Sequence, residues 1–238
     1  MARAGSDQGK ARPTLVDVVA RLKKLYKNAT PIAPTTPFEI VLWKNMGYLI
    51  DDDHRSALFA EFKARVGLSS GAIAAAAPQT LMDIATRGGM RPDARVEKWR
   101  AIAALAIARA DGDLNRALPK LPLAKQIALL KAFPSIGGPG ADEILLLSGL
   151  DVRPSIDSNG LRSMLRLGLC KEGPNYAASY RAATAVLAQQ GKPTRDWLTL
   201  AFQMLRIHGQ TLCKRTEPKC VACPLAPQCP RTALKGSY

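Results

Sequence analysis

Apolar residues recur at helical spacing along most of this chain, and no stretch of useful length alternates between apolar and polar positions as a strand would. Thr14 is a suitable N-cap for the first such stripe, which is formed by Leu15, Val18, Val19, Leu22 and Leu25. Periodicity and capping residues predict further helices over residues 38–46, 55–66, 71–76, 78–86, 94–109, 123–133 and 158–167, and another that opens at residue 143. The pattern therefore predicts an all-α fold of many helices without an internal repeat.

Two segments lack this periodicity. Residues 1–13 are basic, polar and unpatterned, so we expect a disordered basic arm there. Residues 29–37 contain three prolines, which favour an extended linker over a helix. The helical part of the chain is thus predicted to begin at residue 14 and to be interrupted before residue 38.

The charge of the chain indicates a polyanionic partner. The sequence holds 34 Lys and Arg against 19 Asp and Glu, a formal net charge of +15 over 238 residues. The phosphates of nucleic acid are the simplest partner for such an excess, and a membrane surface is the competing one. We expect no membrane association, because the chain has no apolar run of about 18 residues and no apolar signal-peptide core.

Four of the five cysteines gather near the C-terminus with the spacing C-x6-C-x2-C-x5-C; they are Cys213, Cys220, Cys223 and Cys229. Thiolates select zinc or an iron–sulfur cluster, and four of them satisfy either. Because the spacing is not two symmetric C-x2-C pairs, we favour a [4Fe–4S] cluster over a structural zinc site. An odd cysteine number does not suit a secreted disulfide framework, so a cytoplasmic location is expected. The fifth, Cys170, is predicted to lie in a core helix as a small hydrophobe.

A glycine-rich connection, FPSIGGPGAD, occupies residues 133–142 between two predicted helices. Glycines permit positive φ and bring backbone N–H groups close to an anion, and the N-terminus of the following helix adds a partial positive charge. Such a helix–hairpin–helix binds DNA phosphate without reading sequence. An ordinary corner between two helices is the alternative interpretation of the glycines.

These motifs together resemble one family. FPSIGGPGA resembles the hairpin L-P-G-[VI]-G-x-x-T-A of the endonuclease III-like helix–hairpin–helix DNA glycosylases, and the cysteine tail matches their iron–sulfur loop. PSIDSNGLR, at residues 154–162, resembles the segment that carries the family's catalytic aspartate, and IHGQTLC, at residues 207–213, resembles its L-H-G-x-x-x-C. The four motifs stand in the family's order, and the resemblance spans roughly residues 14 to 229.

The resemblance implies a helical fold of two domains with a cleft between them. A six-helix barrel with the hairpin would span residues 36–149, and residues 14–35 and 150–238 would form the iron–sulfur cluster domain. The implied activity is removal of a base that is flipped out of the DNA stack. The resemblance places the catalytic carboxylate at Asp157, which would stabilise positive charge on the sugar and could activate the attacking water. A helix N-cap is the alternative role of Asp157, and the two are compatible.

One departure from the family pattern concerns the reaction. Bifunctional members carry a hairpin lysine that attacks C1′ as an amine. Pro139 stands at that position, both by alignment of the hairpin and by counting back eighteen residues from Asp157. We therefore expect a monofunctional glycosylase that uses water, with a bifunctional enzyme using another lysine as the alternative. Lys44 and Lys131 are the nearest substitutes, although a solvated surface is the expected place of both. Ser135 replaces the first family glycine, so the hairpin geometry is expected to differ slightly.

The resemblance also indicates which residues contact DNA. The expected phosphate contacts come from the hairpin and from the loop between the first two cysteines: Ser135, Gly137, Gly138, Gly140, Lys214, Arg215 and Lys219. Residues 42–51 fall where the family lines its base pocket and fills the gap left by the flipped base. Tyr48 or Asn45 would be the wedge, and Trp43 or Tyr48 would stack on the base, with buried core as the alternative for Trp43. For the three basic loop residues, a solvated charge run is the alternative.

The sequence thus predicts a monomeric, base-excising DNA glycosylase acting on double-stranded DNA with a damaged or mismatched base. A catalytically silent DNA-binding or damage-sensing homologue that keeps fold and cluster is the second hypothesis. An electron-transfer protein is a third, which the positive charge and the hairpin disfavour. The base that is removed is left open between mismatched or deaminated pyrimidines and alkylated purines.

Overall fold

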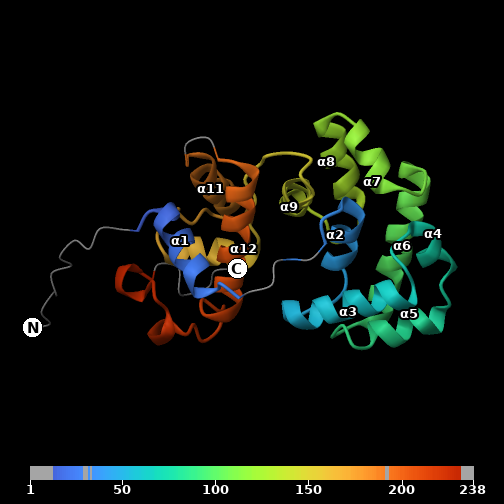
Figure 1. The fold of residues 1–238 in the computed structure, drawn as a ribbon, viewed down its shortest axis with the longest axis horizontal. Coiled ribbons are helices and arrows are strands. Elements are labelled where there is room, and N and C mark those ends of the chain that lie inside the picture. Colours follow the sequence, from blue (N-terminus) through green and yellow to red (C-terminus); the bar gives the residue numbers. More distant parts are fainter. Residues whose placement is uncertain (1–12, 29–31, 33, 191–192, 232–238) are drawn as a thin grey trace, which may run out of the picture. The chain divides into compact units, whose positions relative to one another are not determined.

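The computed structural model of the chain describes residues 13–28, 32, 34–190 and 193–231. Within these residues the secondary structure is helical, and the one β interaction is an isolated bridge between Tyr48 and Gly89. The predicted all-α class is therefore confirmed (Figure 1). The predicted arm at residues 1–13 lies outside the described residues except for Pro13. No described helix is long and apolar enough to cross a bilayer.

The described chain divides into two compact units. One unit contains the helix α1 and the chain from Pro154 onward, and the other contains the chain between residues 30 and 153. The divisions fall at 29/30 and 153/154, beside the predicted domain boundaries at 35/36 and 149/150. The barrel and cluster-domain assignments themselves stay predictions.

The unit between residues 30 and 153 contains eight α-helices and one 3-10 turn among its described residues. They are α2 (Pro37–Lys44), α3 (Asp52–Arg65), α4 (Ser70–Ala75), α5 (Pro78–Ala85), α6 (Pro92–Ala110), α7 (Leu114–Ala117), η1 (Leu118–Lys120), α8 (Leu123–Ala132) and α9 (Gly138–Ser148). Capping side chains set several of the starts: Asp51 accepts from the His54 amide and Ser69 from the Ala72 amide. Trp99 and Phe62 meet edge to face in the core, with ring centroids 4.8 Å apart.

The other unit is built from the two ends of the chain. It contains α1 (Leu15–Leu25), α10 (Ser158–Arg166), α11 (Tyr176–Ala188), α12 (Arg195–Thr211) and the 3-10 turns η2 (Cys220–Ala222) and η3 (Ala226–Gln228). Thr14 caps α1 as predicted, accepting from the Asp17 amide at 3.1 Å. The apolar face of α1 packs on α12, and α10 packs against α12 along much of its length (Figure 1). This packing brings Arg206 and Gly209 of α12 beside the start of α10, and it places the beginning of the cysteine loop against Arg162 and Arg166, further along α10.

Candidate active site and cysteine pocket

Asp157 lies immediately before α10 and caps it. One carboxylate oxygen accepts a hydrogen bond from the Gly160 amide at 2.8 Å, and the other accepts from Nδ2 of Asn159 at 3.0 Å. The second oxygen also forms an ion pair with Arg206 of α12. The side chains of Asp157 and Arg206 are only 11% and 10% exposed, so this ion pair is largely shielded from water. The N-cap role is therefore observed, and the carboxylate is held in one orientation by three donors.

A line of polar contacts runs from Asp157 to the first clustered cysteine. Asn159, which donates to Asp157, accepts in turn from Arg162 at 2.9 Å. Arg162 is 4% exposed and donates through Nε to the Cys213 carbonyl at 2.9 Å and through Nη2 to the Gly209 carbonyl at 2.7 Å. A buried guanidinium that finds carbonyl acceptors fixes the backbone it binds. Asp157 and the start of the cysteine loop therefore share one rigid support.

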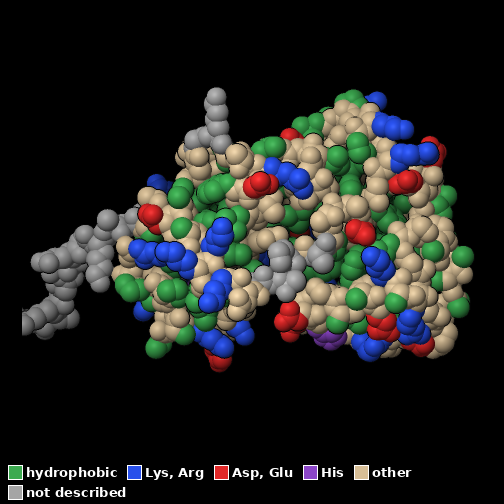
Figure 2. Space-filling view, in the orientation of Figure 1, with side chains coloured by type: hydrophobic (Ala, Val, Ile, Leu, Met, Phe, Trp, Pro, Cys, Tyr) green, Lys and Arg blue, Asp and Glu red, His purple; other side chains and the backbone are tan. Residues whose placement is uncertain are grey.

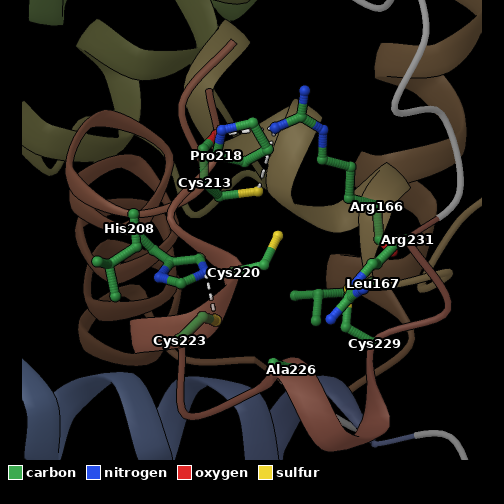
Figure 3. A pocket seen from close by; sticks show the side chains of 11 residues that line it. Arg166, Leu167, His208, Cys213, Pro218, Cys220, Cys223, Ala226, Cys229 and Arg231 are labelled. Carbon is green, nitrogen blue, oxygen red and sulfur yellow. Dashed lines mark hydrogen bonds between the residues drawn. The ribbon is translucent and has the colours of Figure 1, made fainter. Parts of the chain in front are cut away.

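The four clustered cysteines line a single pocket, shown in Figure 3. None of them forms a disulfide. Arg166 of α10 holds the loop around this pocket, donating to the Lys214 carbonyl at 2.6 Å and the Arg215 carbonyl at 3.2 Å. Its Nη1 also lies 3.6 Å from Sγ of Cys213. Among the described residues, no three His, Cys, Asp or Glu side chains are arranged to hold a single metal ion.

Burial shapes the protonation states around this pocket. It lowers the pKa of His208 to about 4, so the imidazole is neutral near pH 7. Nε2 of His208 lies 3.7 Å from Sγ of Cys223, and its Nδ1 lies 3.2 Å from the hydroxyl of Tyr26. Burial, with a smaller contribution from neighbouring cysteines, raises the pKa of the Cys223 and Cys229 thiols. The side of the pocket at His208 thus carries no charge of its own.

The glycine-rich segment forms a turn between α8 and α9, in the other unit. Gly137 is the N-cap residue of α9, and Gly138, Pro139 and Gly140 form the first turn of that helix. Ser135 adopts the left-handed backbone conformation, with φ of 62°, that a glycine would adopt without strain. Nζ of Lys98 donates to its hydroxyl at 3.0 Å. The amides in the first turn of α9 have no partner within the helix, as at any helix N-terminus, and this is the feature that an anion site uses.

The predicted basic contacts of the cysteine loop, Lys214, Arg215 and Lys219, are all exposed, while the backbone carbonyls of the first two are held by Arg166. Lys and Arg side chains are also scattered over the drawn face of both units (Figure 2). The roles of these three residues stay predictions.

Cys170 differs from expectation, because it lies beyond the end of α10 in a bend and is half-buried. Burial raises the pKa of its thiol to about 11.

The residues predicted for the base pocket separate into buried and exposed ones. Trp43 is 2% exposed and Asn45 is 5% exposed, while Tyr48 is 62% exposed. Asn45 donates to the carbonyls of Val41 and Pro134, and so ties the end of α2 to the hairpin turn. The burial favours the core interpretation of Trp43 and leaves Tyr48 as the accessible wedge candidate.

Two further exposed apolar residues, which the sequence did not single out, accompany Tyr48. Leu49 is 78% exposed and Met90 is 63% exposed. Their loops are joined because the Tyr48 amide donates to the Gly88 carbonyl at 2.9 Å. Only glycine suits position 89, which has φ of 86° and would place a Cβ atom 2.4 Å from the Tyr48 carbonyl oxygen. In the sequence, Met90 stands between Gly89 and Pro92, and this flanking of an apolar residue by two turn-forming residues is the signal that could have indicated its exposure on a loop.

Comparison with known proteins supports the family resemblance. No protein-family model matches the chain. The chain is 28% identical over 133 residues to endonuclease III homologue 1, chloroplastic, of Arabidopsis thaliana. The aligned residues make up 55% of this chain but only 32% of that protein. The aligned region thus spans about a third of this curated relative.

Solved structures resemble the chain over most of its length. A trapped endonuclease III–DNA covalent intermediate matches with a TM-score of 0.69 at 15% identity, covering 90% of this chain and 93% of the other. A thermostable thymine-DNA glycosylase matches with 0.67 at 14% identity, covering 91% and 95%. A 3-methyladenine DNA glycosylase of H. pylori, bound to 1,N6-ethenoadenine, matches with 0.62 at 13% identity, covering 82% and 96%. The resemblance indicated by the sequence motifs is thereby confirmed, and the chain has the fold of the endonuclease III-like helix–hairpin–helix DNA glycosylases.

Proposed function

We propose that this protein is a monofunctional DNA glycosylase, which flips a damaged or mismatched base out of double-stranded DNA and hydrolyses its N-glycosidic bond. The observation that carries the proposal is a carboxylate, Asp157, fixed at the start of α10 in a chain with this fold. A held carboxylate stabilises the positive charge that develops on the sugar as the base departs. Water then completes the displacement, with Asp157 as the acceptor of its proton.

The absence of a hairpin nucleophile supports the monofunctional reaction. Pro139 stands in the first turn of α9, where the bifunctional members carry their lysine, and proline has no side-chain amine. Of the two substitutes, Lys131 is exposed on α8 and Lys44 is engaged in an ion pair with Glu143. Strand cleavage is therefore expected only after alkali breaks the abasic site.

DNA is the proposed partner of two surfaces. The hairpin turn, with Ser135, Gly137, Gly138 and Gly140, offers backbone amides and a helix N-terminus to one phosphate. Lys214, Arg215 and Lys219 offer side-chain charge to others. Tyr48, Leu49 and Met90 are proposed to fill the gap left by the flipped base, because exposed apolar side chains on tight loops are suited to insertion between base steps.

We further propose that Cys213, Cys220, Cys223 and Cys229 hold a [4Fe–4S] cluster. Four reduced cysteines around one pocket, with the Arg166 guanidinium beside them, suit an anionic thiolate-bound group. The spacing C-x6-C-x2-C-x5-C, which is not two symmetric C-x2-C pairs, is the reason for preferring the cluster over a single zinc ion. When bound, the cluster would fix the loop that carries the basic residues. A brown preparation with about four irons per chain is expected, and a colourless, zinc-bearing one would contradict this assignment.

A catalytically silent DNA-binding homologue is the second candidate. The ion pair with Arg206 favours it, because a carboxylate that is already neutralised by an arginine stabilises a sugar cation less. The two candidates differ in whether any base is released from DNA.

The deciding experiment incubates the purified protein with duplexes that carry uracil, mispaired thymine, alkylated purines or oxidised bases, with and without alkali. Strand breaks that appear only after alkali are the expected result. Breaks without alkali, together with adducts trapped by borohydride, would show a lyase. Binding without release of any base would instead support the silent homologue.

A further inference from the structure

A second charged pair lies beside the hairpin, in a place that the proposed reaction does not use. Lys44, at the end of α2, forms an ion pair with Glu143 of α9. The Cε atom of Lys44 lies 3.5 Å from the position that a Cβ atom on Gly140 would occupy. The lysine therefore reaches the first turn of α9, next to Pro139, from a different helix.

The ion pair between Lys44 and Glu143 is only partly buried. The Glu143 side chain is 3% exposed and that of Lys44 is 20% exposed, so solvent reaches the lysine but hardly reaches the carboxylate. Among the described residues, Oε1 of Glu143 is buried and finds no hydrogen-bond donor. An ion pair buried this way contributes little to stability, so its place beside the hairpin calls for a role other than stability.

We propose that Lys44, positioned by Glu143, is a specificity-determining residue that presents a positive charge to the flipped base and selects neutral bases over cationic alkylated purines. The inference rests on the proposed glycosylase function. Its basis is the place of the ammonium at the hairpin, in the segment that the family resemblance assigns to the base pocket.

The chemistry of base release supplies the selectivity. When the bond between C1′ and the base nitrogen breaks, its electron pair stays with the base. Uracil and thymine then depart as anions with charge on their carbonyl oxygens, and a nearby ammonium stabilises that charge. A base alkylated at N3 or N7 is cationic before the bond breaks and departs neutral, so the same ammonium repels it in the ground state and gains nothing in the transition state. Water adds to C1′, and the proton that it loses balances the proton taken up by the departing anion.

The ion pair also distinguishes this role from that of a nucleophile. Attack on C1′ needs a neutral amine with a free lone pair. In the pair with Glu143 the group is an ammonium, which has no lone pair to offer. An electrostatic role therefore agrees with the reaction proposed above, which uses water.

The test compares excision of neutral and cationic bases under single-turnover conditions. The substrates are duplexes with uracil, mispaired thymine or hypoxanthine on one side, and 7-methylguanine or 3-methyladenine on the other. Lys44→Met combined with Glu143→Leu removes the pair without leaving a buried charge. Lys44→Arg keeps the charge, and Lys63→Met removes an equal charge from the exposed face of α3.

The wild-type protein is expected to excise a neutral base and to act weakly on the cationic ones. The double variant should lose roughly 10²–10³-fold in the rate on the neutral base, the usual effect of removing one donor to a developing anion. Its rate on the cationic bases should stay level or rise, while Lys44→Arg retains most selectivity and Lys63→Met changes none. An unchanged ratio, or an equal loss on both classes, would overturn this inference and leave the glycosylase function standing. A wild-type protein that releases no base would overturn both.

Discussion

Replacing Asp157 should separate its structural role from its chemical one. Asp157→Asn keeps an oxygen that can accept from the Gly160 amide, so the start of α10 remains capped. It removes the negative charge that pairs with Arg206 and that would stabilise the sugar cation. Asp157→Ala removes the cap as well. The difference between the two variants therefore measures the cap, and the loss that they share reports the charge.

The expected sizes follow from burial. Loss of an N-cap costs about 1 kcal/mol. Removal of one partner from a buried ion pair costs about 3–5 kcal/mol, and both side chains here are close to 10% exposed, so the lower end applies. Asp157→Asn should then lose about 3 kcal/mol of unfolding free energy and Asp157→Ala about 4. For a chain of this length each kcal/mol lowers the melting temperature by about 2–4 °C.

The assay pairs thermal unfolding with single-turnover base excision at a temperature well below unfolding. Asp157→Asn should lose about 10²–10⁴-fold in rate. Combining it with Arg206→Leu removes both charges, and should restore most of the stability while leaving the rate low. A double variant that regains the rate would show that the loss in Asp157→Asn came from the arginine charge and not from the missing carboxylate. A single variant with the wild-type rate would remove Asp157 from the mechanism.

Three other outcomes are expected. Because burial raises the pKa of Cys170 to about 11, its alkylation by iodoacetamide near pH 8 should be about 100-fold slower in the folded protein than in urea, and should rise about tenfold per pH unit up to pH 11, as followed by mass spectrometry. Gly209→Ala should destabilise the protein by about 1–3 kcal/mol, since its Cβ atom would stand 2.3 Å from the Asn159 carbonyl oxygen, whereas Gly71→Ala, with open space around it, should be neutral or stabilising in thermal unfolding. Arg166→Met should release the cysteine loop, lowering iron per chain and speeding proteolysis after residue 213.

Each of these three predictions can be contradicted by a specific result. Equal alkylation of Cys170 in the folded and unfolded chains would refute its burial. Equal effects of the two alanine substitutions would mean that α10 and α12 do not pack closely at Gly209. Full iron content and unchanged cleavage in Arg166→Met would show that the loop is held by other contacts, and Lys214→Met provides the matched control for loss of a nearby charge.

Local signals in the sequence predicted much of the helical fold. Thr14, Ser69 and Asp157 cap helices that begin within a residue of the predicted starts, because capping depends on a side chain and an amide only three residues apart. Cys170 was placed wrongly, since an apolar stripe does not show where a helix yields to a bend. The four-residue helix α7 is too short to show a period at all.

The site was less predictable, because its contacts join residues far apart in the chain. Arg206 pairs with Asp157 across 49 residues, and Lys44 pairs with Glu143 across 99. Nothing local marks these side chains as partners, since only tertiary packing brings their helices together. Asn45 illustrates the converse, because a polar residue in a pocket segment suggested exposure, whereas its amide is used to tie α2 to the hairpin turn.

The division of one unit between the two ends of the chain has a consequence for how the protein is made. The unit between residues 30 and 153 is continuous and can fold as soon as it has left the ribosome. Helix α1 is synthesised before it, but the partners of α1 come last: Tyr26 contacts Thr211, and Arg21 contacts Gln228, 207 residues later. Its apolar face, with Leu15, Val18, Val19 and Leu22, stays uncovered until α12 has been translated. Helix α1 is thus made before the unit between residues 30 and 153 but packs after it, and a nascent chain stalled before α12 would expose it to chaperones and to aggregation.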